Sequence, residues 1–382
     1  MKILFAGGGT GGHLFSGVAV AEDYLARPRD GKSPSQNDLL FVGTSYGLEN
    51  TLIPKLGYRL ELIPVQQLKG QGIGQRLKSL AQVPYALFKS FQLLRREKPD
   101  LVMGIGGYAS GPVTLMARFM GIRTAIIEQN SYPGLTNRIL GKFVHRVFIA
   151  FENARKFFKP SKTTLAGNPV RKSFFNVSPS PQPSPVEGEG VKRGIPPKKE
   201  GVENVFTLLI LGGSQGAHSI NQAMVDALPS FAGTPLRVMH QTGKNDAGMV
   251  REAYEKAGVK AEVFDFIQDV QNFYAQADLV IARAGAGTIT ELQNLGKPSI
   301  LIPYPYAADD HQRLNAQEVA EAGAARLLLN RDLNGKRLFE EIDALRKDPK
   351  LLHSMGEQAR RLAKPLAAHE ILKICEEMVL GS

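Results

Sequence analysis

Short apolar runs alternate with stretches of helical periodicity along the whole chain of 382 residues. The apolar runs predict buried strands, and helical patterns such as 216–228 and 310–322 lie between them. We expect strands at 2–6, 39–42, 59–63, 100–103, 124–127 and 146–149 in the first half, and at 205–211, 236–240, 261–264, 278–281, 299–302 and 326–329 in the second. Strands that alternate with helices predict βαβ units and a parallel sheet in each half.

The chain is too long for one ordinary domain, since domains average roughly 150 residues. We expect an N-terminal domain over 1–165, a C-terminal domain over 166–364 and a helix at about 365–382 that packs back on the first domain. The tract 178–203 begins with alternating Ser and Pro and is typical of an exposed insertion or linker. Two nucleotide-type domains would leave a cleft between the carboxyl ends of their strands.

Composition narrows the class of protein. With 43% apolar and 22% charged residues, the chain is globular rather than disordered or fibrous. No apolar run approaches the roughly 20 residues that span a bilayer, and no signal-peptide core follows Met1, so we expect the chain to remain in the cytoplasm. The single cysteine, Cys375, excludes an intramolecular disulfide and a multi-cysteine metal site.

The net charge of +11 indicates an anionic partner, and it is unevenly distributed. Residues 1–165 hold 22 Lys and Arg against 10 Asp and Glu, whereas residues 166–382 hold 25 against 26. The pI of about 9.6 also suggests a nucleic-acid binder. Against that alternative, the chain has no Trp and no recognisable nucleic-acid motif.

Each half places a glycine-rich loop between its first strand and the following helix, at 8–13 and 212–218. Such loops allow close backbone approach and present free N–H groups at a helix N-terminus, which suits a phosphate. A tight packing turn is the alternative, but two loops at matched places favour ligand binding. The first loop fits G-x-G-x-x-G, yet 42–44 supplies no acidic residue for a ribose, which disfavours a nicotinamide site.

His13 is the strongest general-base candidate among the seven histidines, because it stands where the first glycine loop becomes a helix. A helix N-terminus disfavours the imidazolium, so His13 should be neutral; a simple capping role is the alternative. Polar loops also follow other strands, at 104–112, 128–130, 167–171, 283–291 and 309–315. They suit a sugar nucleotide, and no Asp-x-Asp pair is present to hold a metal–diphosphate.

Together these loops resemble those of one family, the bacterial glycosyltransferases that add N-acetylglucosamine (GlcNAc) to the lipid-linked muramyl-pentapeptide of cell-wall synthesis. The resemblance covers nearly the whole chain except about 178–203. Its carriers are Gly9-Thr-Gly-Gly-His13, Gly104-Ile-Gly-Gly-Tyr-Ala-Ser-Gly-Pro112, Glu128-Gln-Asn130 with Pro133-Gly-Leu-Thr-Asn137, Gly167-Asn-Pro-Val-Arg171, Gly212-Gly-Ser-Gln-Gly-Ala217, Arg283-Ala-Gly-Ala286 with Glu291, and Asp310-His-Gln312 with Asn315.

The resemblance implies an α/β fold with two Rossmann-like domains facing across a cleft, the GT-B glycosyltransferase architecture. It implies inverting, metal-independent transfer of GlcNAc from UDP-GlcNAc to the C4 hydroxyl of MurNAc in lipid I, undecaprenyl-diphosphate-MurNAc-pentapeptide. The product would be lipid II with a β-1,4 bond, for peptidoglycan synthesis. No cofactor and no nucleic acid would take part, and the enzyme would lie peripherally on the cytoplasmic face of the inner membrane.

The resemblance also implies site roles, residue by residue. His13 would be the base, and Thr10, Gly11, Gly12 and Asn130 would line the cleft between donor and acceptor. Ser214 and Gln215 would bind the donor diphosphate with help from Arg171, Ile267 would meet uracil through its backbone, Glu291 would bind the ribose and Gln312 the GlcNAc hydroxyls. Gly106, Gly107, Tyr108 and Asn137 would form the acceptor side. Ile127 departs from the pattern, since many relatives carry a histidine there.

Other two-domain sugar-nucleotide enzymes, such as a UDP-GlcNAc 2-epimerase or an antibiotic glycosyltransferase, are the enzymatic alternative, but they would lack the acceptor-side motifs at 104–112 and 128–137.

Between 69 and 98 there are seven Lys and Arg and one acidic residue. An apolar helical stripe crosses this stretch at Leu77, Leu80, Pro84, Leu87, Phe91 and Leu94, while Val83 and Tyr85 fall off it. This combination favours contact with an anionic membrane over a core helix with a solvated basic face.

Overall fold

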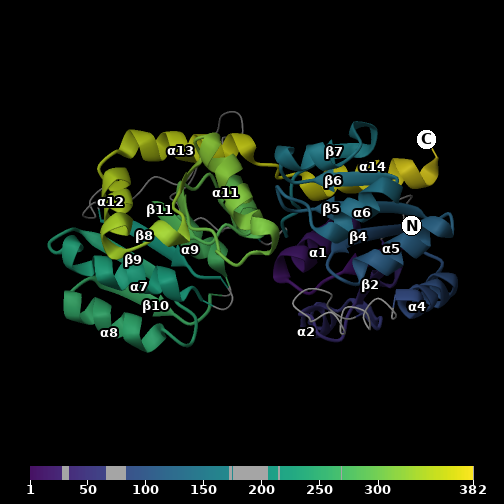
Figure 1. Cartoon of the computed structure of the whole chain (residues 1–382), viewed down its shortest axis with the longest axis horizontal. Helices are drawn as coiled ribbons and strands as arrows, with labels where there is room; N and C mark the ends of the chain where they lie inside the picture. The colour runs from purple at the N-terminus through teal and green to yellow at the C-terminus, as the bar shows by residue number, and fades with distance from the viewer. Residues whose placement is uncertain are drawn as a thin grey trace, which may run out of the picture.

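The computed structural model of the chain describes residues 1–27, 34–65, 83–171, 174, 205–213, 216–267 and 269–381. The Pro-rich tract, Ser214 and Gln215 therefore lie outside the described residues. The described chain forms two α/β domains, each built on one parallel sheet (Figure 1). The prediction of two Rossmann-like domains is confirmed.

The N-terminal sheet has seven strands in the order β3-β2-β1-β4-β5-β6-β7. Its strands are β1 Ile3–Gly7, β2 Leu39–Gly43, β3 Arg59–Leu62, β4 Leu101–Gly106, β5 Arg123–Glu128, β6 Arg146–Ile149 and β7 Thr163–Leu165. Its helices are α1 Gly11–Leu25, α2 Glu49–Lys55, α4 Val83–Glu97, α5 Ser110–Phe119 and α6 Leu135–Phe143. The central strands β1, β2 and β4 are buried along their whole length, as their near-continuous apolar sequence requires.

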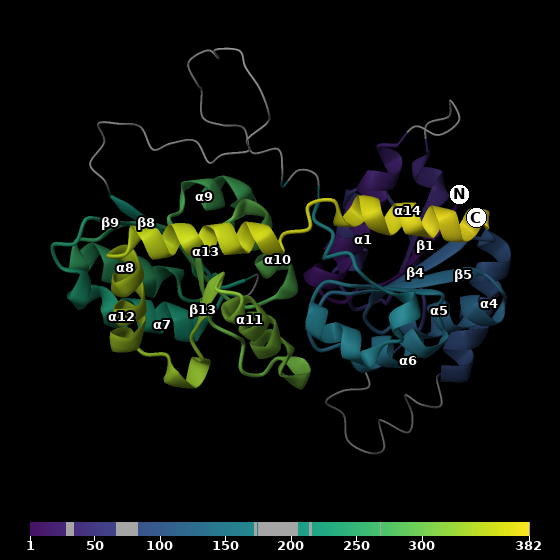
Figure 2. The same cartoon turned by 90° about the horizontal axis from the view of Figure 1, so that it is seen from above.

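Alternate residues of β1 enter two separate cores. Ile3 and Phe5 pack with α1 and with Ile371 of α14 Ala367–Leu380, whereas Leu4 and Ala6 pack with α4 and α5. The C-terminal helix α14 therefore covers the N-terminal sheet on the side of α1, and α4, α5 and α6 lie on the other side (Figure 2). The chain thus crosses between the domains twice.

The C-terminal sheet has six strands in the order β10-β9-β8-β11-β12-β13. Its strands are β8 Phe206–Leu211, β9 Leu236–Gln241, β10 Lys260–Phe264, β11 Leu279–Ala282, β12 Ser299–Leu301 and β13 Ala325–Leu327. Its helices are α7 His218–Ala227, α8 Ala247–Ala257, α9 Val270–Gln276, α10 Ala286–Leu295, α11 His311–Glu321, α12 Gly335–Arg346 and α13 Pro349–Leu362. Two apolar cores cover its two faces, one containing Leu208 and Ile210 and the other Leu209 and Leu211.

Every strand expected from the sequence is present, with shifts of one to three residues at the ends. The strand β7 was not expected, because Thr163-Thr164-Leu165 is short and mostly polar. It pairs with β6 at the edge of the sheet, where a strand needs little apolar sequence. Among the helices of the described residues, none is both long and apolar enough to cross a membrane.

Candidate active site

The first glycine loop is fitted against the loop that follows β4. Gly7, Gly8 and Gly9 have φ angles of 140°, 148° and 86°, which side chains rarely adopt. A Cβ on Gly7 would overlap the carbonyl oxygen of Gly106, and the N–H of Gly8 donates to that oxygen at 3.0 Å. Glycine is therefore required in this loop for backbone conformation and for close approach, before any ligand is considered.

His13 lies in the first turn of α1, where its Nδ1 is 3.1 Å from the hydroxyl of Thr10. Burial, with a smaller contribution from the nearby His311 of the C-terminal domain, lowers its pKa to about 4, although a backbone hydrogen bond with Gly8 opposes the shift. The imidazole is therefore neutral at pH 7. A Cβ on Gly106 would come within 2.7 Å of the ring, so this glycine leaves the space that His13 occupies.

Glu128 organises the loop after β5 from a buried position. Its Oε1 accepts a hydrogen bond from the N–H of Asn130 at 2.9 Å, and its Oε2 accepts one from Nδ2 of Asn137 at 2.9 Å. Burial raises the pKa of Glu128 to about 7 despite these donors. Asn137 is only 3% exposed, so its side chain lies behind the loop as a support for Glu128.

Helix α11 of the C-terminal domain contacts the same loop. Asn315 accepts a hydrogen bond from the N–H of Ser131 at 2.7 Å and donates to Oδ1 of Asn130 at 3.2 Å. Glu318, one turn further along, accepts from the hydroxyl of Ser131 at 2.8 Å and from the N–H of Glu152 at 2.8 Å. The predicted cleft residue Asn130 is thus held at the boundary between the domains.

The segment that joins the domains carries a second bridge. Asn168 is buried, and its Oδ1 accepts from the hydroxyl of Ser16 in α1 at 2.7 Å. Its Nδ2 donates to the hydroxyl of Thr290 in α10 at 3.3 Å. The next predicted site residue, Arg171, stacks over the ring of Phe15 at 4.4 Å, and its charge partly opposes the rise that burial causes in the pKa of Glu291.

The predicted donor-side residues lie at the carboxyl ends of the second sheet. Glu291 of α10 accepts a hydrogen bond from the hydroxyl of Tyr274 at 3.1 Å, and burial raises its pKa to about 7. Gln312 accepts from the N–H of Tyr304 at 2.9 Å. Ile267 is only 7% exposed and packs in the core, which leaves its backbone rather than its side chain for a ligand.

The second glycine loop also requires its glycines. Gly213 and Gly216 have φ angles of 80° and 77°, and a Cβ on Gly216 would overlap the carbonyl oxygen of Thr242. The loop leads into α7 at His218. The structure therefore places both glycine loops as expected at strand-to-helix junctions, although Ser214 and Gln215 themselves lie outside the described residues.

The structure brings one part of the expected set together directly. Thr10 and His13 contact each other, and Gly106 borders His13. Gly107 meets the backbone of Gly8, and Tyr108 follows at the partly exposed end of the same turn. Sequence reasoning missed Glu49 and Glu318, which hold these loops from behind, and gave no role to Asn168 within the 167–171 motif.

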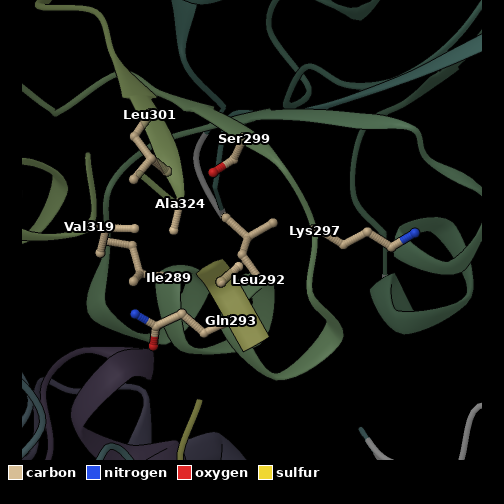
Figure 3. Close-up of a pocket in the computed structure, with 9 residues that line it drawn as sticks. Ile289, Leu292, Gln293, Lys297, Ser299, Leu301, Val319 and Ala324 are labelled. Atoms are coloured by element: carbon tan, nitrogen blue, oxygen red, sulfur yellow. The ribbon is translucent and has the colours of Figure 1, made fainter. Parts of the chain in front are cut away.

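A separate shallow hollow in the C-terminal domain, with almost no room for a water molecule, lies among α10, β12, α11 and α13. Figure 3 shows mainly apolar side chains around it, with Lys297 pointing away. The ammonium of Lys297 instead donates to the carbonyl of Ala277 at 2.9 Å, and its burial lowers its pKa to about 8. Nothing in this hollow connects it with the loops above.

The chain matches models of both halves of one enzyme family. The glycosyltransferase family 28 N-terminal domain matches residues 3–149, and the C-terminal domain of the same family matches residues 207–371. The chain belongs to glycosyltransferase family 28. It is therefore a glycosyltransferase, and its glycine loops and polar strand ends are those of a family 28 enzyme.

A curated relative shows which group of transferases within family 28 the chain belongs to. A UDP-N-acetylglucosamine–N-acetylmuramyl-(pentapeptide) pyrophosphoryl-undecaprenol N-acetylglucosamine transferase from Myxococcus xanthus is 45% identical over 382 residues, which are 100% of this chain and 94% of the relative. At this identity over the full length, the chain belongs to this family of transferases within family 28. The resemblance inferred from the motifs is confirmed.

Solved structures agree on the architecture. The crystal structure of MurG from Acinetobacter baumannii is similar with a TM-score of 0.77 and 26% identity, covering 98% of this chain and 99% of that one. The UDP-GlcNAc 2-epimerase from Neisseria meningitidis has a TM-score of 0.63 at 13% identity and covers 99% of this chain and 100% of its own. The epimerase likeness shows the fold alone, and the GT-B prediction for this family 28 chain is confirmed.

Two further predictions concern Ile127 and metal ions. Ile127 is fully buried and belongs to the core that contains Ile3 and α14, so an apolar side chain fits its surroundings. In the part of the chain that the structure describes, no three His, Cys, Asp or Glu side chains are grouped as metal ligands would be.

Proposed function

We propose that this family 28 enzyme transfers GlcNAc from UDP-GlcNAc to the C4 hydroxyl of MurNAc in lipid I and so forms lipid II for peptidoglycan synthesis. The observation that carries the proposal is full-length identity of 45% with a transferase named for this reaction. The geometry supports it. The neutral imidazole of His13 lies between the first glycine loop and the glycine-containing loop after β4, and His311 of the other domain is near it.

His13 is the proposed general base. A neutral imidazole can take the proton of the C4 hydroxyl as the oxygen attacks the anomeric carbon of UDP-α-GlcNAc. Attack opposite to the leaving UDP inverts the anomeric centre and gives a β-1,4 bond. The Thr10 hydroxyl at 3.1 Å orients the ring, and the tight fit against Gly106 limits its rotation.

The donor is proposed to lie against the C-terminal domain. The N-terminus of α7, next to Ser214 and Gln215, would stabilise the negative charge that grows on the departing diphosphate. Arg171 would assist from the joining segment, while Glu291 would accept the ribose hydroxyls and Gln312 those of GlcNAc. Because the helix and the arginine supply positive potential, the proposed reaction needs no metal ion and no cofactor.

The acceptor side is proposed to be the N-terminal domain, at Gly106, Gly107, Tyr108 and the loop that Asn137 supports. Its charge suits a lipid diphosphate. The exposed apolar side chains of α4 are Val83, Tyr85 and Phe88, whereas Leu94 of the expected stripe is buried and Leu87 and Phe91 are half-buried. Pro84, also in the expected stripe, is exposed at the start of the helix. The part of the stripe from Leu87 to Leu94 is therefore the inward face of α4, and its 77 and 80 positions lie outside the described residues.

Helix α5 packs beside α4, and α6 packs beside α5 on the same side of the sheet (Figure 2), and both helices carry exposed apolar side chains. Phe119 is 67% exposed, Leu135 57% and Ile139 47%. With basic residues among them, this face is suited to the anionic cytoplasmic leaflet of the inner membrane. Peripheral binding there would bring the acceptor loops to lipid I.

The test is a transfer assay with labelled UDP-GlcNAc and a short-chain analogue of lipid I, with and without EDTA. We expect a β-1,4-linked disaccharide lipid and a rate that EDTA does not change. Donor epimerisation or hydrolysis without transfer would instead support a 2-epimerase-type activity. A rate abolished by EDTA and restored by a divalent ion would overturn the metal-free part alone.

A further inference from the structure

Glu49, the first residue of α2, is a carboxylate buried in the N-terminal domain. It is only 1% exposed, and it forms none of the ion pairs found among the described residues. A buried carboxylate is costly unless hydrogen bonds replace its water. The hydrogen-bond partners of Glu49 therefore indicate its structural role.

Those partners are the backbone of the first glycine loop and of the loop after β2. Oε2 of Glu49 accepts from the N–H of Gly9 at 2.7 Å. Oε1 accepts from the N–H of Thr44 at 2.9 Å and from the Thr44 hydroxyl at 3.1 Å. Hydrogen bonds between backbone N–H groups and an ionised carboxylate are among the stronger ones in proteins.

Glycines at three positions leave room for this side chain. A Cβ on Gly8 would lie 2.6 Å from the carboxyl carbon of Glu49, and a Cβ on Gly43 or Gly47 would overlap the same side chain. Residues 42–44 supply no acidic side chain. The carboxylate beside the end of β2 belongs to Glu49, five positions after Thr44, and it accepts hydrogen bonds from the protein's own backbone.

The hydrogen bonds of Glu49 fix a segment that continues directly to His13, the proposed base. Gly8 donates to Gly106 on one side, and Gly9 donates to Glu49 on the other, so two successive N–H groups are fixed. Thr10 follows as the N-cap of α1 and contacts His13 through its hydroxyl. A shift of Gly9 would therefore displace the Thr10–His13 pair.

We infer that Glu49 is a positioning residue for transfer, because its carboxylate fixes the glycine loop that orients Thr10 and His13. This inference rests on the proposed function, in which His13 is the base. Glu49 contacts neither donor nor acceptor in this arrangement, and it acts on the rate of the chemical step through backbone geometry.

The discriminating variant is Glu49→Gln, which preserves size but places an NH2 group against at least one N–H donor. Its matched control is Glu97→Gln. Glu97 is also a buried carboxylate of this domain, and it accepts from Lys2 at 2.8 Å and from Arg59 at 3.2 Å. Because Lys2 precedes β1, this network lies at the amino ends of the strands, away from the glycine loops.

We expect Glu49→Gln to lower kcat roughly 10- to 100-fold while the KM for UDP-GlcNAc changes by less than about twofold. Glu97→Gln should keep kcat within about twofold of the parent, even if its Tm falls as far as the Tm of Glu49→Gln. The ring signals of His13 in NMR, assigned with His13→Gln, should shift in Glu49→Gln and stay in place in Glu97→Gln.

An unchanged kcat in Glu49→Gln, or an equal loss in Glu97→Gln, would overturn the positioning role. So would His13 ring signals that do not respond to the Glu49 substitution. If the parent enzyme itself transfers no GlcNAc, the proposed function fails, while the NMR comparison still decides whether Glu49 positions His13. The two failures are thereby distinguishable.

Discussion

The backbone N–H of Ser131 donates to Oδ1 of Asn315 at 2.7 Å, although the two residues belong to different domains. Both are buried, so the hydrogen bond is shielded from water. Asn315 also donates to Asn130 on the same loop at 3.2 Å. The position of α11 is thereby coupled to a loop that we propose borders the reacting groups.

The first prediction concerns Glu318→Ala, which removes the acceptor for Ser131 and for the N–H groups of Glu152 and Asn153. A hydrogen bond to a charged group contributes about 1.5–3 kcal/mol, and two of these three bonds are exposed to water. A net loss equivalent to about one such bond should weaken the contact between the domains and lower kcat/KM roughly 10- to 100-fold. Binding of UDP alone should change little, because the proposed donor residues lie outside this contact. Transfer kinetics, UDP titration and small-angle scattering would measure these effects.

The control for this prediction is Gln317→Ala. Gln317 is the neighbour of Glu318 on α11, but its side chain bonds within the helix, to Arg313 and Glu321. We expect kinetics and scattering close to those of the parent. If both variants behave alike, the contact between α11 and the N-terminal domain has no role in closure.

The second prediction concerns the loss of His13. His13→Ala should lower kcat by ~10²–10⁴, the usual contribution of a general base. The donor KM should be nearly unchanged, since the imidazole is proposed to act on the acceptor hydroxyl. Near-normal turnover of the folded variant, checked by circular dichroism, would show that another group takes the proton.

The third prediction is the pH dependence that His13 imposes. The base must be unprotonated, and burial lowers its pKa to about 4, so kcat at saturating UDP-GlcNAc should be lost only as the pH falls towards 4. A free imidazole would instead make kcat fall below about pH 6.5. The acid limb of kcat, measured with both substrates saturating so that donor binding by Glu291 does not contribute, would distinguish the two cases, provided that stability is monitored over the same range.

Much of the architecture could be predicted from the sequence because local patterns specify it. The runs at 39–42 and 101–103 are buried on both faces, and so they are apolar throughout. The glycines at 7–9 were identifiable because positive φ angles and close approach leave little alternative. By contrast, β7 depends on pairing with β6 rather than on its own residues.

The supporting residues of the site could not be predicted for a related reason. Glu49 looks like an exposed first-turn acid of a short helix, and only the fold brings it to Gly9, 40 positions earlier in the chain. Glu318 reaches Glu152 across 166 positions. Contacts of this kind leave no periodicity or spacing in the sequence, so motif reasoning finds the loops and misses what holds them.

The fourth prediction is that UDP-GlcNAc binds more tightly as the pH rises through about 7. Burial raises the pKa of Glu291 to about 7 in the free protein, so it is partly protonated there. Ribose hydroxyls donate best to the ionised carboxylate, so binding should lower this pKa and release a proton. Affinity should therefore increase from pH 6 to 8, by up to about tenfold per unit of pKa change.

Calorimetry in two buffers of different ionisation enthalpy would measure the proton released on binding. Glu291→Gln should bind more weakly and show little pH dependence between 6 and 8. An equally steep dependence in that variant would assign the proton to another group. An unchanged donor affinity at all pH values would remove Glu291 from the proposed ribose site.

The last prediction concerns the apolar face of α4, α5 and α6. Phe88 is 53% and Phe119 67% exposed, so replacing both with Ser should leave the fold intact and weaken binding to anionic vesicles. Leu380 of α14 is 82% exposed on the opposite side of the sheet, and Leu380→Ser should bind like the parent. Sedimentation with anionic and neutral vesicles would compare the three proteins. Equal binding of the parent to both vesicle types would contradict the electrostatic contribution, and equal binding of the three proteins would place the membrane contact on another face.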